Sequence, residues 1–163
     1  MAVKRRFPYR SAAVACNGGC RAEGKDLQCE YGCIGCGACE AACRFDAIHV
    51  GADGVAEVDT EKCIGCGACT RACPQQIIRV HETANYIFVK CSNEDKGADA
   101  RKMCDVSCIG CGICERTCTA NAIRVINHCA VIEDAYCLSC GMCAVNCPRH
   151  AIHDLAGVLT KKP

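Results

Sequence analysis

One spacing of cysteines occurs four times in this chain of 163 residues. In each copy, three cysteines are separated by two residues and a fourth follows after three more, C-x2-C-x2-C-x3-C. A chain with so many thiols in such short loops can fold only around what those thiols bind. The four copies use 16 of the 22 cysteines, namely Cys33, Cys36, Cys39 and Cys43; Cys63, Cys66, Cys69 and Cys73; Cys108, Cys111, Cys114 and Cys118; and Cys137, Cys140, Cys143 and Cys147.

This spacing is typical of chains that bind a cubane [4Fe-4S] cluster, because three nearby thiolates bind three irons and a more distant one completes the site. Zinc ribbons also use C-x2-C pairs, but a longer loop separates their two pairs. The sequence therefore predicts four [4Fe-4S] clusters, with all 16 cysteines as cluster and metal ligands. It contains no glycine-rich phosphate loop, no paired acid-base carboxylates and no nucleophile constellation. We predict an electron-transfer protein with no catalytic residues or substrate site of its own.

Three other interpretations of the cysteines compete with this one. A disulfide framework is typical of small secreted domains, but no secretory signal is recognisable and the crowded cysteines would strain several bridges in one turn. The spacing Cys29-x3-Cys33-x2-Cys36 matches radical-SAM enzymes, yet two of these residues already belong to a cluster motif and the chain is too short for a substrate barrel. A redox-silent structural metal-binding module remains the alternative from another functional class.

The composition predicts a thin core. The hydrophobic fraction of 51% includes cysteine, and the chain has no Trp, four Tyr and three Phe. We therefore expect the clusters to fill the cores and their binding to be coupled to folding. No segment approaches the roughly 20 apolar residues that span a bilayer. We expect a cytoplasmic, reducing and anaerobic setting, because the thiolates must stay reduced until iron arrives, and we expect no nucleic-acid partner.

The chain contains an internal duplication. Residues 29–50 and 104–125 are identical at 12 of 22 positions with an offset of 75. The same offset pairs Cys16 with Cys91, and an offset of 74 pairs Cys63 with Cys137. Such self-similarity indicates tandem copies of one unit. The predicted segments are a basic N-terminal segment with Cys16 and Cys20 (1–28), a first two-cluster domain (29–82), a linker with Cys91 (83–103) and a second two-cluster domain (104–163).

Each unit is predicted to be a small α+β fold with pseudo-two-fold symmetry. Short β-branched runs on either side of turn residues predict a β-hairpin between the two motifs of each unit. These runs are 47–50 and 55–58 around the turn 51–54, and 123–126 and 129–132 around the turn 127–128. A further strand closes each unit, at 77–80 and at 151–155. A short helix is expected between the third and fourth cysteines of each motif, as at 40–42.

From Cys29 onward the chain resembles the bacterial two-cluster ferredoxin family, in which the fourth cysteine of each motif ligates the other cluster. Members of that family usually have proline after the fourth cysteine. Pro74 and Pro148 match this pattern, whereas Arg44 and Thr119 do not. The resemblance implies four crossed ligand sets: Cys33, Cys36 and Cys39 with Cys73; Cys63, Cys66 and Cys69 with Cys43; Cys108, Cys111 and Cys114 with Cys147; and Cys137, Cys140 and Cys143 with Cys118.

A narrower resemblance rests on residues 14–20, residues 90–97 and the duplication. Together they are similar to the polyferredoxin part of the B subunit of the Rnf ferredoxin-oxidising complex. This resemblance implies a polyferredoxin that relays single low-potential electrons, as a subunit of an oxidoreductase with ferredoxin, flavoprotein or iron-sulfur partners. It also implies peripheral docking on the cytoplasmic face of a membrane complex. A freely diffusing carrier is the alternative. The family's N-terminal anchor and additional cluster domain are not recognisable, so we expect a piece of a longer subunit or a free-standing relative.

Six cysteines lie outside the motifs. The duplication relates Cys16 to Cys91 and Cys29 to Cys104, so these four thiols would converge if the halves packed about a pseudo-two-fold axis. Three outcomes remain open: a fifth cluster that bridges the halves, a disulfide within each pair Cys16–Cys29 and Cys91–Cys104, or reduced buried thiols. The six residues are Cys16, Cys20, Cys29, Cys91, Cys104 and Cys129.

Overall fold

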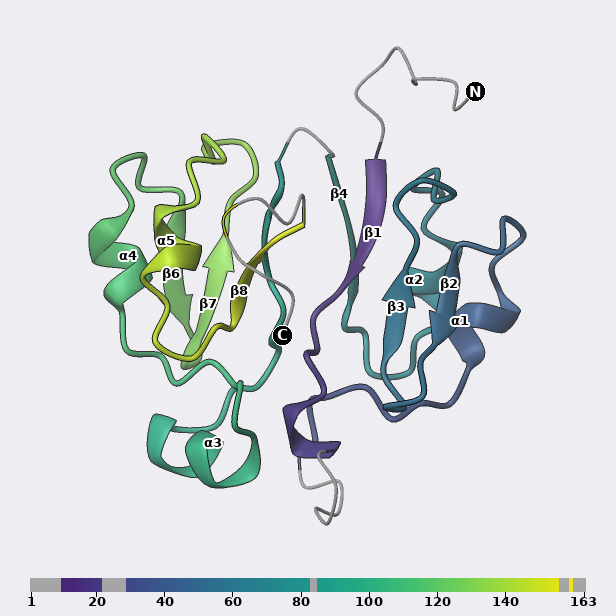
Figure 1. Ribbon diagram of the computed structural model, residues 1–163, viewed down its shortest axis with the longest axis horizontal. Helices are drawn as coiled ribbons and strands as arrows, with labels where there is room; N and C mark the ends of the chain where they lie inside the picture. Colours follow the sequence, from purple (N-terminus) through teal and green to yellow (C-terminus); the bar gives the residue numbers. More distant parts are fainter. Residues whose placement is uncertain (1–9, 22–28, 83–84, 156–158, 160–163) are drawn as a thin grey trace.

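The computed structural model describes residues 10–21, 29–82, 85–155 and 159, and these form two lobes side by side (Figure 1). We call residues 10–82 the first half and residues 85–155 the second half. The first half contains β1 (Arg10–Val14), a 3-10 helix (Gly19–Arg21), α1 (Ala38–Ala41), β2 (Ile48–Val50), β3 (Ala56–Val58), α2 (Ala68–Ala72) and β4 (Ile78–Glu82). The second half contains β5 (Ile87–Val89), α3 (Gly97–Met103), α4 (Ile113–Thr117), β6 (Ile123–Ile126), β7 (Cys129–Ile132), α5 (Met142–Val145) and β8 (Ile152–Asp154).

Each half has two antiparallel strand pairs. β1 pairs with β4 and β2 with β3 in the first half, while β5 pairs with β8 and β6 with β7 in the second half. The register places Ala12 opposite Val80 and Phe88 opposite His153. The mixture of short helices and strands therefore occurs in the same order in both halves.

The predicted hairpins are confirmed. The β2–β3 pair joins Ile48 to Val58, and the β6–β7 pair joins Ile123 to Ile132. The second hairpin turns at Asn127 and His128, which both have positive φ angles of 46° and 63°. That combination is typical of a two-residue turn whose twist matches the flanking strands. The predicted closing strands are also present, as β4 and β8.

Strands β1 and β5 were not predicted. Their residues lie in the predicted N-terminal segment (1–28) and linker (83–103), whereas the structure pairs them with β4 and β8. Four of the five β1 residues are buried, so this strand has no alternation of polar and apolar residues to reveal it. Short strands buried on both faces cannot be distinguished by periodicity.

The apolar cores are small, as the composition predicted. In the first half, Ile48 and Ile78 pack with alanines, valines and cysteines. In the second half, Ile123 and Ile152 form the equivalent group. The largest fully buried apolar side chains are isoleucines. Within the described ranges, no helix has the length and apolar character needed to span a bilayer.

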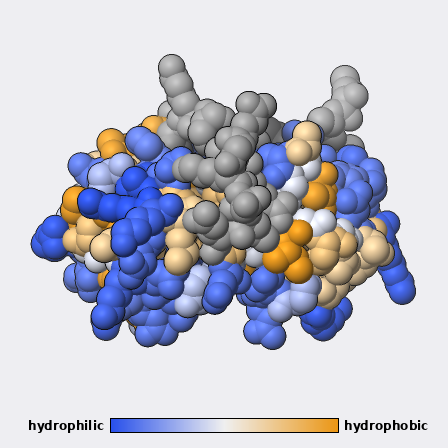
Figure 2. Space-filling view, turned by 90° about the horizontal axis from the view of Figure 1, so that it is seen from below, coloured by the Kyte–Doolittle hydropathy of each residue, from blue (hydrophilic) through white to orange (hydrophobic). Residues whose placement is uncertain are grey.

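The surface seen from below is mostly hydrophilic, with several separate hydrophobic patches on the described residues (Figure 2). Several large apolar side chains elsewhere in the fold are exposed, among them Ile34, Ile64 and Leu138, which each follow the first cysteine of a motif. These three side chains lie at the edges of the cavities described below.

Candidate iron-sulfur sites

Three cavities are each lined by three cysteines of one motif and the fourth cysteine of the neighbouring motif. The empty space in them, mouths included, is about 340, 340 and 360 Å³. The structure thus brings together three of the four crossed sets that the ferredoxin resemblance implied. The cysteine sets are Cys33, Cys36, Cys39 and Cys73; Cys63, Cys66, Cys69 and Cys43; and Cys137, Cys140, Cys143 and Cys118.

The remaining set lies together as well. Burial is the main cause that raises the pKa of the Cys114 thiol to about 11, and the neighbouring Cys108, Cys147 and Cys111 contribute to that rise. These residues are therefore close enough to interact electrostatically across two different motifs. Cys108, Cys114 and Cys147 also pack in one apolar cluster.

The exposure of the cysteines follows their order in the motif. The second cysteine of each motif is exposed, whereas the third is buried in the first three motifs and half-buried in the fourth. The four exposed residues are Cys36, Cys66, Cys111 and Cys140. Each cysteine set therefore has one edge at the protein surface, and its other cysteines are half-buried or buried.

The interior thiols are poor acids in the surroundings that the protein alone provides. Burial is the main cause that raises the pKa of Cys39, Cys69 and Cys143, the last to about 12. Metal ligation requires thiolates, so a bound group must supply the positive charge that favours the deprotonated form. The iron-sulfide core of a cubane cluster has that charge.

Backbone N–H groups point at the sulfurs of the fourth cysteines. The Ala47 and Ala122 amides donate to Cys43 Sγ and Cys118 Sγ, each at 3.4 Å. The turns that position them lack the family's proline, so Arg44 and Thr119 do not prevent this geometry. Three residues after the fourth cysteine of every motif, the backbone has a positive φ angle of 50–53°, at Asp46, Gln76, Asn121 and His150.

These four turn residues are not among the residues that the cysteine spacing predicts. A signal was available, because the recurring Asp and Asn at this position are among the residues that tolerate a left-handed backbone. Strand β1 is a second contribution that was missed: the Ala12 amide donates to Cys63 Sγ at 3.3 Å. N–H donors to cluster sulfurs stabilise the more negative, reduced state.

The cysteine sets suit the group that their spacing predicts. Their surroundings are mostly apolar, with Val14, Val50 and Ile78 around one cavity, and thiolates are the usual ligands of iron-sulfur clusters. In the described part of the chain, no three or more His, Cys, Asp or Glu side chains are arranged to hold a metal ion directly. The cysteines surround cavities instead.

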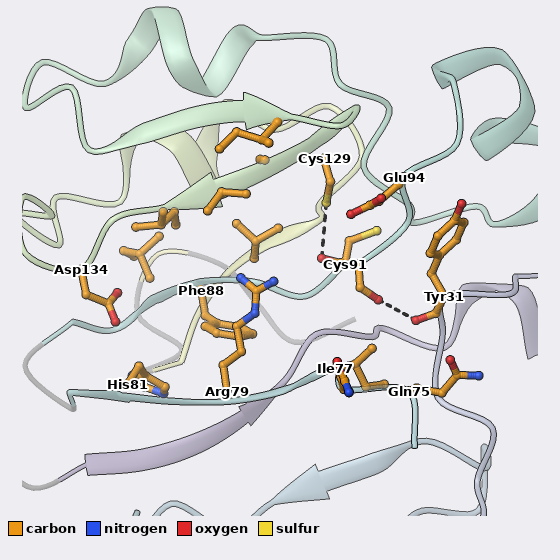
Figure 3. A pocket seen from close by; sticks show the side chains of 18 of the residues that line it. Tyr31, Gln75, Ile77, Arg79, His81, Phe88, Cys91, Glu94, Cys129 and Asp134 are labelled. Atoms are coloured by element: carbon orange, nitrogen blue, oxygen red, sulfur yellow. Dashed lines mark hydrogen bonds between the residues drawn. The ribbon is translucent and has the colours of Figure 1, made fainter. Parts of the chain in front are cut away.

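Cys91 and Cys129 lie at the edge of a wider groove between the halves, whose empty space, mouth included, is about 1380 Å³ (Figure 3). The Cys129 thiol donates to the Cys91 carbonyl oxygen at 3.4 Å, and the Cys108 amide donates to Cys91 Sγ at 3.2 Å. The hydroxyl of Ser92 donates to the Tyr31 carbonyl oxygen at 2.7 Å, which joins the two halves. The groove is also lined by Arg79 and other polar side chains.

Comparison with protein families matches nearly the whole region that contains the motifs. Two models described as "4Fe-4S dicluster domain" match residues 29–80 and 62–123, and one described as "4Fe-4S binding domain" matches residues 135–151. Together the matches include all four cysteine motifs. They do not include Cys16 or Cys20.

Three relatives are named as B subunits of ion-translocating oxidoreductase complexes. The B subunit of the Na(+)-translocating ferredoxin:NAD(+) oxidoreductase complex of Acetobacterium woodii is 45% identical over 69% of this chain and 34% of the relative. Its proton-translocating counterpart from Clostridium ljungdahlii is 45% identical over 69% of this chain and 40% of the relative. The B subunit of the ion-translocating oxidoreductase complex of Methanosarcina acetivorans is 42% identical over 48% of this chain and 30% of the relative.

The matched region is about a third of the length of these curated relatives. Within that region, the dicluster family models, the crossed cysteine sets and the identity to the B subunits agree. The chain is a tandem ferredoxin of 4Fe-4S dicluster domains that resembles the B subunits of ion-translocating ferredoxin:NAD(+) oxidoreductase complexes.

Proposed function

We propose that this chain relays single electrons through four [4Fe-4S] clusters as an iron-sulfur subunit of an Rnf-like oxidoreductase complex. The observation that carries the proposal is the grouping of three cysteines of one motif with the fourth cysteine of its neighbour around one cavity. A bound cluster supplies reversible one-electron reduction without a change of ligands. The chain holds the thiolates and directs backbone N–H groups at several of them.

The proposed ligands are the four crossed sets named above. Each short helix contains the third cysteine of its motif and is followed by the fourth. In the crossed arrangement, these two cysteines bind different clusters of the same half. Helices α1 and α2 contact each other, as do α4 and α5, which supports a close approach of the two sites within each half. Close approach favours electron transfer between the sites.

The repeated element order supports two further features of the fold. We infer that each half has pseudo-two-fold symmetry and that the clusters complete its core, since the buried apolar side chains are few and cysteines are interspersed among them. We also propose that the two-cluster units, predicted at 29–82 and 104–163, include the preceding strands β1 and β5. These strands pair with the closing strand of their own half.

The partners are inferred from the relatives, whose names specify ferredoxin as one reactant and NAD(+) as another. Because this chain matches only about a third of those subunits, the activity of the whole complex is part of the proposal. We infer that a reduced ferredoxin donates each electron and that a flavin or iron-sulfur partner accepts it, at the cytoplasmic face of the membrane. The exposed second cysteines provide surface edges where such partners could dock.

The decisive experiment is metal analysis of anaerobically purified protein. Four cubane clusters require at least about 16 iron and 16 acid-labile sulfide per chain, with visible absorption that bleaches on reduction. Stoichiometric zinc, or iron without sulfide, would overturn the electron relay and favour a redox-silent structural module. Anaerobic copurification with membrane redox subunits would separate a docked subunit from a freely diffusing carrier.

A further inference from the structure

Five of the six cysteines outside the motifs line one cavity between the two halves. Its empty space of about 300 Å³ is close to the 340–360 Å³ of the motif cavities. Four of the five are buried, with no more than 8% of their surface exposed, and Cys91 is half-buried. These cysteines are Cys16, Cys20, Cys29, Cys91 and Cys104.

Sulfurs from both halves border this cavity. A Cβ atom placed on Gly32 would lie 3.5 Å from Cys16 Sγ and 3.7 Å from Cys29 Sγ, so both sulfurs border the same small space. A Cβ atom on Gly19 would come within 2.9 Å of Cys104 Sγ, which belongs to the other half. The duplication alone predicted this convergence only if the halves packed about a symmetry axis.

The backbone around four of these sulfurs repeats at the offset of 75. Amides of Asn93 and Cys108 donate to Cys91 Sγ at 3.5 and 3.2 Å. Burial raises the pKa of Cys16, while hydrogen bonds from the equivalent amides of Gly18 and Cys33 oppose that shift. The same relation holds for Cys29 with the Tyr31 amide and Cys104 with the Val106 amide, where burial is again the main cause of a raised pKa.

A buried donor on the cavity wall points to an anionic occupant. Asn93 is only 1% exposed and lines the cavity. Its side-chain nitrogen has no hydrogen-bond partner among the described residues, although buried donors are nearly always paired. Lys90 also lines the cavity, and Arg149 donates to the Cys104 carbonyl oxygen at 2.7 Å. Positive and N–H groups of this kind suit a cluster whose thiolate-bound form is negatively charged.

We propose that Cys16, Cys29, Cys91 and Cys104 bind a fifth [4Fe-4S] cluster, with two ligands from each half. All of these cysteines are free thiols in the structure, so neither of the two disulfides that the sequence left open is formed. Cys20 has no counterpart in the second half, where Asp95 occupies the equivalent position. We therefore assign Cys20 as a buried neighbour and not as a ligand.

The fifth cluster would connect the two halves electrically, an inference that rests on the proposed electron relay. One electron would pass from a reduced motif cluster in one half to the interface cluster and then to an oxidised motif cluster in the other half. No bond to a ligand changes in this transfer. In each half, a single hydrogen bond links a motif ligand to an interface ligand: the Cys33 amide donates to Cys16, and the Cys108 amide donates to Cys91.

The test is the iron and sulfide content of the full chain after anaerobic reconstitution. The wild-type chain is expected to hold about 20 iron and 20 sulfide, and the Cys16→Ala or Cys91→Ala chain about 16 of each. In these variants, the four remaining clusters should still be reducible, as detected by electron paramagnetic resonance. Cys20→Ala is the matched control and should keep about 20. In Asn93→Asp, which removes the donor and adds negative charge, one of the five signals should shift to a more negative potential.

The outcomes separate this inference from the proposed function. About 16 iron in the wild-type chain, with four reducible clusters, would overturn the fifth cluster and leave the relay intact. Loss of four irons in Cys20→Ala but not in Cys16→Ala would overturn the ligand assignment. Zinc or sulfide-free iron in the wild-type chain would overturn both. The wild-type stoichiometry decides the matter even if a cysteine variant fails to fold.

Discussion

The two halves have the same element order but differ at one buried position of the hairpin between their two motifs. An offset of 74 places Val55 of the first half at the position of Cys129 in the second half. Both side chains are buried. Val55 presents only apolar atoms toward Gly18, whereas the Cys129 thiol donates a hydrogen bond to the Cys91 carbonyl oxygen. The duplicated scaffold thus preserves the positions of the motif cysteines and varies the groups around them. Such neighbouring groups are what tune the potential of an iron-sulfur cluster.

The largest effect is expected from removing a fourth cysteine, which tests whether the halves share the crossed arrangement. Cys43→Ala should destroy or convert the cluster of Cys63, Cys66 and Cys69, because Cys43 lines their cavity. Up to about four irons should be lost per chain. Cys118→Ala should do the same to the cluster of Cys137, Cys140 and Cys143. Anaerobic spectroscopy and iron analysis measure the loss.

The two variants serve as controls for each other. In each case the cluster held by the first three cysteines of the mutated motif should survive. If that cluster is lost and its neighbour persists, ligation occurs within single motifs and the crossed arrangement is wrong for that half.

The second effect concerns one glycine in each half, Gly65 in the second motif and Gly110 in the third, that a backbone segment approaches closely. Gly65 has a φ of +68°, and a Cβ atom there would lie 2.5–2.7 Å from Arg10 of β1. Gly110 has a φ of +62°, and its Cβ atom would lie 2.8 Å from the His128 carbonyl oxygen in the β6–β7 turn. Alanine at either position should cost about 1–2 kcal/mol for the left-handed backbone and about 1–3 kcal/mol more for the clash.

Neighbouring glycines provide matched controls. Gly67 and Gly112 have similar φ angles of +73° and +69°, but a Cβ atom at either would meet mainly the end of a flexible arginine side chain. Gly67→Ala and Gly112→Ala should therefore show only the backbone cost. The midpoint of cluster loss in denaturant, measured anaerobically, should fall more for Gly65→Ala and Gly110→Ala. Equal midpoints within each pair would rule out the close backbone contacts.

Local sequence signals predicted the hairpins and closing strands correctly, for identifiable reasons. The hairpins have β-branched residues on both sides of a turn, and their pairing depends on residues close in the chain. Strand β1 has no such signal: it is rich in alanine, buried almost throughout, and pairs with β4, which lies far along the chain. The sequence could not locate it because its partner is set by the fold of the whole half.

The same contrast applies to the candidate sites. The motif cysteines follow from spacing alone, and the ferredoxin resemblance implied which sets would meet. The donors that surround them do not follow from spacing. The Ala12 amide reaches Cys63 only because β1 pairs with β4. The side-chain nitrogen of Asn93 is buried without a hydrogen-bond partner among the described residues, and its sequence context does not predict this. Tertiary placement of backbone and polar groups was the missing information.

A smaller effect is expected from exchanging the residues that distinguish the halves. The nearby Cys129 thiol is the main cause that lowers the pKa of both Cys108 and Cys91. Cys129→Val should remove this donor and make the potential of the Cys108 cluster more negative. A net hydrogen bond of about 0.5–1.5 kcal/mol corresponds to roughly 20–60 mV for one electron. A redox titration monitored by electron paramagnetic resonance measures the shift.

The reciprocal change, Val55→Cys, tests the comparison from the other side. A thiol there should make the potential of the equivalent cluster in the first half less negative. Val55→Ala is the control for the change in packing, since it introduces no donor. A less negative potential in Cys129→Val would show that the thiol does not stabilise the reduced state.

The smallest effect is a pH dependence that we expect in the first half only. His49 Nδ1 lies 3.3 Å from Glu40 Oε1, and hydrogen bonding to Glu40 is the main cause that raises the pKa of His49. Because the pKa of His49 is higher in the folded state, the ion pair stabilises the fold fully at pH values below the unfolded-state pKa of about 6.5. This stabilisation is lost as the pH rises through the folded-state pKa. The second half has Arg124 at this position, which stays charged throughout. His49→Arg should therefore slow cluster loss relative to wild type at pH 8, and should change the rate of loss little at pH 6. His49→Gln should accelerate cluster loss at pH 6, and should change the rate little at pH 8. Identical ratios at both pH values for both variants would show that His49 titration does not contribute to stability.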